Sequence, residues 1–118
     1  MEYNAYNRVA QMKQEFIQAW PMIYDDDDLL IAATNRVALV LEVSGVELYP
    51  AFQLDENRKP YPVIKELLKR ADVKQIEDWS IALWFVTPST PDIFKRKPLD
   101  FIQNTEQVLK AFDKELAS

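Results

Sequence analysis

The chain contains a single glycine, Gly45, and two apolar segments meet there. Residues 37–43 precede a Ser-Gly pair, and residues 46–54 follow it. Two runs rich in β-branched and aliphatic residues, separated by two residues that include Gly, are typical of a β-hairpin. We therefore predict a hairpin, with Pro50 at an edge or a bulge because proline cannot donate a ladder hydrogen bond. One buried helix over residues 29–43 is the competing interpretation, since periodicity does not exclude it.

Most of the remaining sequence is predicted to be helical. Apolar residues recur at helical spacing over residues 4–19, and this helix should end before Pro21 because the residue preceding a proline avoids the helical region. Its apolar stripe is expected to pack in the core, with an arm for a homodimer as the alternative. After the hairpin, Pro62 suits the first position of a helix. A capping pattern at Asp72 then predicts a central buried helix over residues 73–86.

Two shorter helices should complete the chain. Pro98 is expected to open a short helix, and Asn104 to cap a last one with Val108 and Phe112 facing inward. The predicted fold class is α+β and mostly helical: an N-terminal helix, one β-hairpin, then a bundle of about four short helices. At 118 residues the chain is expected to be a single domain over residues 1–118.

Composition narrows the chemistry that the chain can perform. It has no His and no Cys, which excludes most nucleophile–base pairs, thiolate chemistry and zinc sites of the Cys type. One glycine allows neither a dinucleotide-binding glycine motif nor a P-loop. The formal charge of −5 argues against a general affinity for nucleic acid, because phosphate contacts need clustered Lys and Arg. We therefore predict a protein that is not an enzyme and uses no cofactor.

The sequence shows no targeting or membrane segment. Its first residues are polar and acidic, unlike those of a signal peptide. The longest apolar runs are shorter than the roughly 20 residues that span a bilayer. These features predict a cytoplasmic protein with no membrane partner.

The most conspicuous charge run is the four aspartates at residues 25–28. One interpretation is a divalent cation loop, but an EF-hand loop alternates ligands with spacers and needs a Gly and a terminal Glu. The favoured interpretation is a solvated loop whose last residue, Asp28, caps a short helix over residues 29–34. No metal site is therefore expected.

Aromatic residues could enclose a small-molecule pocket between the hairpin and the central helix. The alternative, which we favour, is that they fill the core and that their polar tips find partners there. The residues concerned are Tyr49, Phe52, Trp79 and Trp84.

The only run of three consecutive basic residues is at 95–97. It can be a solvated loop, a small phosphate contact, or part of a protein interface beside Phe94 and Pro98. Such a run is usually a solvated loop, and the interface interpretation rests on the mixture of Arg and aromatic residues that binding surfaces contain.

The second half of the chain resembles the toxin-binding domain of bacterial Xre/MbcA/ParS-like antitoxins. The most specific element is the Tyr-Pro-Ala-Phe-Gln-Leu-Asp run at residues 49–55, followed by a helix that begins with proline. The order and spacing of the later elements add to it, namely Trp79, the Ala-Leu-Trp at 82–84, the Thr-Pro at 87–88 and the Lys-Pro-Leu-Asp-Phe at 97–101. The resemblance extends from about Leu48 to Ala117.

The resemblance implies a role in toxin neutralisation. Residues 46–118 would form the toxin-binding region, and residues 1–45 an N-terminal helix region with the first strand. In that family the C-terminal domain docks on a toxin, commonly an NAD-degrading one, and blocks its active site. The partner contacts would lie in the turn over residues 92–100 and in the C-terminal helix. The implied partner-binding residues are Phe94, Lys95, Arg96, Lys97, Pro98 and Asp100.

Two features depart from the family pattern. The family often has a Gly-containing turn before its Pro-Leu-Asp element, where this chain has Phe-Lys-Arg-Lys at 94–97. The DNA-binding helix-turn-helix of the family is not recognisable between Glu2 and Val43, and the four aspartates would repel phosphate, so DNA binding is not expected. The leading hypothesis is thus a non-catalytic protein that occludes a toxin. The alternatives are a small-molecule-binding module and a degenerate helix-turn-helix autoregulator.

Overall fold

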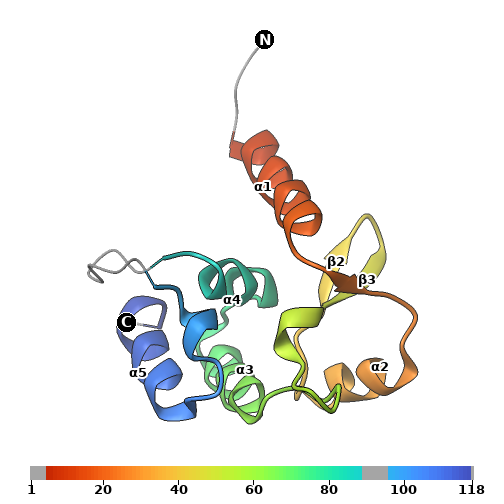
Figure 1. Cartoon of the computed structure of the whole chain (residues 1–118). Coiled ribbons are helices and arrows are strands. Elements are labelled where there is room, and N and C mark those ends of the chain that lie inside the picture. Colours follow the sequence, from red (N-terminus) through yellow and green to blue (C-terminus); the bar gives the residue numbers. More distant parts are fainter. Residues whose placement is uncertain (1–4, 89–95, 118) are drawn as a thin grey trace.

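The computed structural model describes residues 5–88 and 96–117. It confirms the α+β, mostly helical fold class (Figure 1). The elements in chain order are α1 (Ala5–Ala19), β1 (Met22–Ile23), α2 (Asp27–Thr34), β2 (Leu41–Val43), β3 (Val46–Pro50), the 3₁₀ helix η1 (Ala51–Gln53), α3 (Pro62–Lys74), α4 (Asp78–Phe85), the 3₁₀ helix η2 (Pro98–Phe101) and α5 (Thr105–Glu115).

The predicted hairpin is present. β2 and β3 pair antiparallel with Val43 opposite Val46, and the Ser-Gly pair forms the turn. Ser44 has φ 52° and Gly45 has φ 80°, so both turn residues are left-handed, as a type I′ turn requires. The competing helix over residues 29–43 is wrong, because α2 ends at Thr34.

A third strand joins the hairpin, which the sequence did not predict. β1 pairs antiparallel with the end of β3, and the strand order is β1-β3-β2. β1 has only two residues, too few for an alternating pattern to be visible in the sequence.

Pro50 therefore lies in the central strand, and its predicted place on an edge or at a bulge is wrong. It is the last residue of β3 and pairs with Met22 of β1. The next amide, that of Ala51, donates to Pro21 O at 3.0 Å on the β1 side. Because successive amides of a strand point to opposite sides, the missing N–H of Pro50 is on the side of β2. There the ladder has already ended, at Leu41 opposite Leu48.

The structure changes the predicted start of α2 and confirms the predicted start of α3. The cap of α2 is Asp26 rather than Asp28: its Oδ1 accepts a hydrogen bond from Leu29 N at 2.9 Å. The two aspartates that follow lie in the first turn of α2, where the helix dipole favours negative charge. Pro62 is the first residue of α3, as predicted. The apolar stripe of α3 is fully buried and comprises Val63, Ile64, Leu67, Leu68 and Ala71.

The predicted buried helix over residues 73–86 is confirmed for its second half, as α4, but its predicted start is wrong. α3 continues through Asp72 to Lys74, Gln75 takes a left-handed conformation with φ 58°, and α4 begins only at Asp78. The Asp72 carboxylate does not cap a helix but binds Arg36, as does Asp78. A tertiary ion cluster thus overrides the local capping signal.

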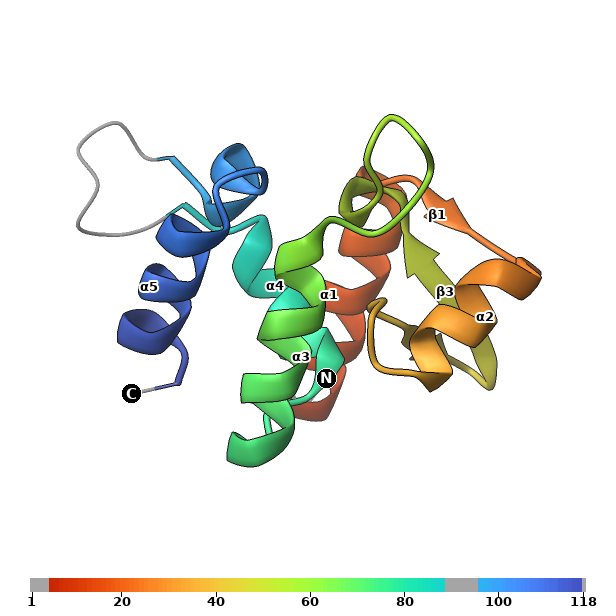
Figure 2. The ribbon, with the colours of Figure 1, turned by 90° about the horizontal axis from the view of Figure 1, so that it is seen from below.

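The helices and the sheet form a row. α5 lies at one end, α3 and α4 in the middle, and the sheet with α2 at the other end (Figures 1 and 2). α3, α4 and α5 share one buried cluster, and α1, the hairpin and α4 share a second. Phe52 of η1 packs against both.

The apolar stripe of α1 enters the core only in part. Phe16 is buried in the cluster with α4, whereas Val9 and Met12 are exposed. Core packing of this stripe is therefore confirmed for its C-terminal half, and the homodimer arm stays a prediction.

Within residues 5–88 and 96–117, no helix is both long and apolar enough to traverse a bilayer.

Candidate functional site

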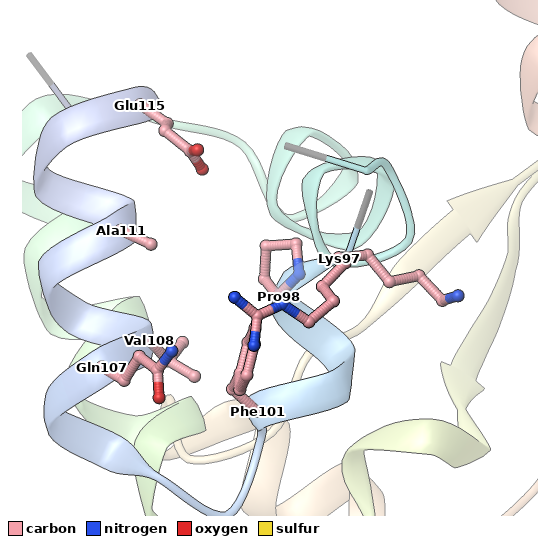
Figure 3. A pocket seen from close by; sticks show the side chains of 8 residues that line it. Lys97, Pro98, Phe101, Gln107, Val108, Ala111 and Glu115 are labelled. Atoms are coloured by element: carbon pink, nitrogen blue, oxygen red, sulfur yellow. The ribbon is translucent and has the colours of Figure 1, made fainter. Parts of the chain in front are cut away.

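Three of the predicted partner-binding residues, Arg96, Lys97 and Pro98, line a groove between η2 and the inner face of α5 (Figure 3). This η2–α5 groove has a volume of about 140 Å³. Its walls include Arg96, Lys97, Pro98, Phe101, Val108 and Ala111.

Contacts between residues close in sequence stabilise η2. The backbone N–H of Lys97 donates to the Asp100 carboxylate at 3.0 Å, and Asp100 N donates back to Lys97 O at 2.9 Å. Pro98, at the first helical position, is buried and needs no N–H partner there. These contacts give the groove a firm wall from a segment of only four residues.

Arg96 lies across the aromatic ring of Phe101. The guanidinium carbon is 4.9 Å from the ring centroid, within the range of a cation–π contact. Arg96 is exposed and Phe101 is half-buried, so this stack lies at the surface.

The other charges of the site lie on different sides of it. The Lys97 side chain points away from α5, and its Nζ is 4.0 Å from Asp100 Oδ1 (Figure 3). Glu115 lies toward the C-terminal end of α5, where its carboxylate accepts a hydrogen bond from Trp84 Nε1 at 2.9 Å. The η2 side of the groove is therefore the positively charged one.

The structure brings together most of the predicted partner-binding residues that it describes. Arg96, Lys97 and Pro98 line the groove, and Asp100 caps η2 from its outer side. Phe94 and Lys95 lie outside the described residues. The sequence reasoning missed Phe101 and Ala111 as wall residues, because only the packing of η2 on α5 shows which apolar side chains remain accessible.

The four aromatic residues of the predicted pocket do not surround one cavity. Tyr49 is buried in a cluster with Leu29, whereas Trp84 packs in the cluster around α5. The ring of Phe52 lies 5.8 to 6.2 Å from those of Phe16, Trp20 and Phe85. Trp79 Nε1 donates to Glu42 O at 3.2 Å, and the indole of Trp84 has the Glu115 partner given above. The four residues are packing residues, and the indole N–H groups of Trp79 and Trp84 are paired.

The aspartate run does not assemble a cation site in the part of the chain that the structure describes. No group of three or more carboxylate, His or Cys side chains there could hold a metal ion.

A cluster of three charged residues, the Arg36 cluster, joins the ends of three helices. The Arg36 guanidinium donates to Asp72 at 2.7 and 3.1 Å and to Asp78 at 3.0 and 3.2 Å. Asp78 also accepts from Val40 N at 3.2 Å. The hydrogen bonds that Arg36 donates to Asp72 and Asp78 raise the pKa of Arg36, and the hydrogen bond from Arg36 lowers the pKa of Asp72. Both effects stabilise the charged forms, so the cluster is a structural clamp rather than a proton-transfer site.

Comparison of the chain with protein-family models, with curated proteins and with solved structures gave no match. The resemblance to the antitoxin domain rests on the sequence elements named above.

Proposed function

We propose that this chain is a non-catalytic protein of the antitoxin type, which neutralises a partner toxin by covering the toxin's active site. The contact surface is the η2 side of the η2–α5 groove. The observation that carries this proposal is the stack of Arg96 on Phe101 at the rim of that groove.

A stacked arginine is a strong contact residue for a protein partner. Arg and aromatic side chains are enriched at interfaces and among the residues that dominate binding energy. The ring of Phe101 restricts the guanidinium before binding, which lowers the entropy lost on association. Lys97, the residue before η2, adds a second positive charge, which the Asp100 carboxylate partly offsets. The partner surface is therefore expected to be acidic.

The residue types in the chain support occlusion rather than catalysis. No His or Cys is present in the sequence to act as nucleophile or as a base near neutral pH. Two of the carboxylates, those of Asp72 and Asp78, are both ion-paired with Arg36. An inhibitor needs a rigid, complementary surface and no reactive group. We place this activity in the cytoplasm.

The described residues give no observation in favour of the two alternative functions. Two of the aromatic side chains that would enclose a small ligand, Phe52 and Trp79, both pack against Phe16 in the core. The N-terminus of α2, which would meet a phosphate backbone in an autoregulator, carries Asp27 and Asp28.

Co-expression tests the proposal directly. The chain is produced with and without the product of the neighbouring reading frame, and growth and co-purification are measured. We expect the neighbouring product alone to arrest growth and the pair to grow and to co-purify as a complex. If no neighbouring product is toxic, or if the two proteins never co-purify, the proposal is rejected.

A further inference from the structure

Residues at the start of α2 and at the hairpin turn line a second groove. α2 and the hairpin lie at the opposite end of the molecule from α5 (Figure 2). We call this second groove the acidic groove. Its volume is about 410 Å³. The residues that line it include Asp25, Asp27, Leu30, Val46, Glu47 and Tyr49.

Exposed apolar side chains gather on this part of the fold. Leu30 is 46% exposed and Val46 is 51% exposed, and both line the groove. Ile31, the next residue of α2, is 60% exposed. Single exposed apolar residues are ordinary on a protein surface, but adjacent ones around a groove are typical of an interaction site.

The rim of this groove carries negative charge only. Asp25, Asp27 and Glu47 are exposed and make no ion pair with any residue of the described part of the chain. No Lys or Arg lines the groove. Burial raises the pKa of Tyr49 in the groove wall, and the carboxylates of Glu47 and Asp26 raise it further.

The negative charge of the rim therefore limits which kinds of partner can cover Leu30 and Val46. A nucleic acid or an anionic lipid surface would be repelled. A segment with apolar side chains on one face and Lys or Arg beside them would bury Leu30 and Val46 while pairing with the rim. Such electrostatic complementarity speeds encounter and fixes orientation.

We propose that the acidic groove is a docking surface for a basic, amphipathic segment of a partner protein. The apolar side chains of that segment lie on Leu30 and Val46, and its cations lie beside Asp27 and Glu47. This surface differs from the η2–α5 groove in place and in charge sign, so it goes beyond the proposed function and can fail independently of it.

A peptide titration of the full chain tests this proposal. The probe is a synthetic amphipathic helix of Leu and Lys, and its Leu and Glu counterpart is the control peptide. Binding is measured by calorimetry and mapped by amide chemical shifts. We expect saturable 1:1 binding of the basic peptide alone, with shifts confined to residues 25–31 and 45–47.

Variants separate this groove from general charge attraction. D27N/E47Q should weaken binding of the basic peptide at least about tenfold, and L30S should weaken it without changing the salt dependence. The matched control is E56Q/E106Q, which removes two exposed carboxylates elsewhere on the surface. Unfolding midpoints show that each variant is folded.

Three results would overturn the proposal. The first is an equal loss of affinity in E56Q/E106Q, and the second is a shift pattern spread over the whole surface. The third is self-association of the unliganded chain through residues 25–31, seen by sedimentation, which would make a second copy the occupant of the groove.

Discussion

The side-chain amide of Gln53 takes the place of a backbone peptide group opposite Leu39. Gln53 Oε1 accepts from Leu39 N at 2.6 Å, and Gln53 Nε2 donates to Leu39 O at 2.9 Å. Continued by two residues, the β2–β3 register would place Leu39 opposite Pro50 in a hydrogen-bonded pair. Pro50 has no N–H to donate, so η1 folds Gln53 back to satisfy Leu39 instead.

Replacing Gln53 by Ala should lower the free energy of unfolding by about 2–4 kcal/mol. The substitution leaves the buried N–H and C=O of Leu39 without partners, and each such group costs about 1–3 kcal/mol. Urea unfolding followed by circular dichroism measures the change. Gln14→Ala, on the exposed side of α1, is the control and should change stability little. A loss under 1 kcal/mol in Q53A, about the value of one ordinary hydrogen bond, would mean that Leu39 finds other partners.

Gln53→Glu should make stability depend on pH in a defined direction. A carboxylate at this buried position can accept from Leu39 N but repels Leu39 O, so burial raises the folded-state pKa of the Glu. With a raised pKa, the stability of the variant is greatest below the ordinary Glu pKa of about 4.3 and is lost as pH rises through the folded-state pKa. Unfolding curves of Q53E and the wild type between acid and neutral pH test this. Parallel pH profiles of the two proteins would contradict it.

The Arg36 cluster should stabilise the junction of α2, α3 and α4. Arg36→Asn removes the guanidinium while keeping a residue that tolerates the left-handed backbone found there, with φ 58°. We expect a loss on the order of 1 kcal/mol, since Asp72 is 49% exposed and its ion pair is screened by solvent. Chemical unfolding of R36N measures it. Lys69→Asn, at an exposed position of α3, controls for the loss of a positive charge.

The same cluster predicts part of the acid sensitivity of the protein. The pKa of Asp72 is lowered in the folded state by the hydrogen bond from Arg36. The stability that it contributes is therefore complete above the ordinary Asp pKa of about 3.9 and is lost as pH falls through the lower folded-state value. Asp72→Asn should give a flatter stability profile than the wild type below pH 4. An unchanged acid slope in D72N would show that other carboxylates account for it.

Two substitutions in the hairpin turn are expected to change the free energy of unfolding in opposite directions. Gly45→Ala should lower the free energy of unfolding by about 1–2 kcal/mol, because φ at this position is 80° and a Cβ disfavours it. A Cβ there would meet no atom within 4 Å, so the cost comes from the backbone alone. Ser44→Asn should raise stability slightly, since Asn-Gly is the preferred type I′ pair. Thermal unfolding of both variants tests the pair, and a stabilised G45A would contradict the turn assignment.

The proposed toxin contact predicts a charge-sensitive interface at η2. Arg96→Glu should weaken binding of the co-purified partner at least about tenfold, because it loses the stacked cation and repels an acidic partner surface. Phe101→Ala should weaken binding less than Arg96→Glu does, because it keeps the positive charge and only removes the ring that orders the Arg96 side chain. Titration calorimetry of the purified pair measures both variants. Lys110→Glu, on an exposed position of α5, is the matched control, and an equal effect there would contradict the η2 surface.

Local sequence signals were sufficient for much of the fold and for part of the site. The Ser-Gly turn, the proline at the start of α3 and the Asn104 cap of α5 were all predicted, and the structure contains them. Each depends on residues within a few positions of one another. The same is true of η2, whose capping contacts lie between Lys97 and Asp100. The groove beside η2 was not predictable in full, because its other wall is α5.

What the sequence alone determined is therefore the type and order of the helices and the hairpin, since turn, cap and stripe preferences act over one or two helical turns. Tertiary structure decided the rest. The two residues of β1 become a strand only against the end of β3, and the helix predicted after Asp72 is divided so that Asp72 and Asp78 both reach Arg36. Gln53 has its role only because Pro50 leaves Leu39 unpaired. In each case the residue interacts with a partner that is distant in sequence and becomes its neighbour only in the folded chain. A buried polar group needs a hydrogen-bond partner, whichever part of the chain supplies it.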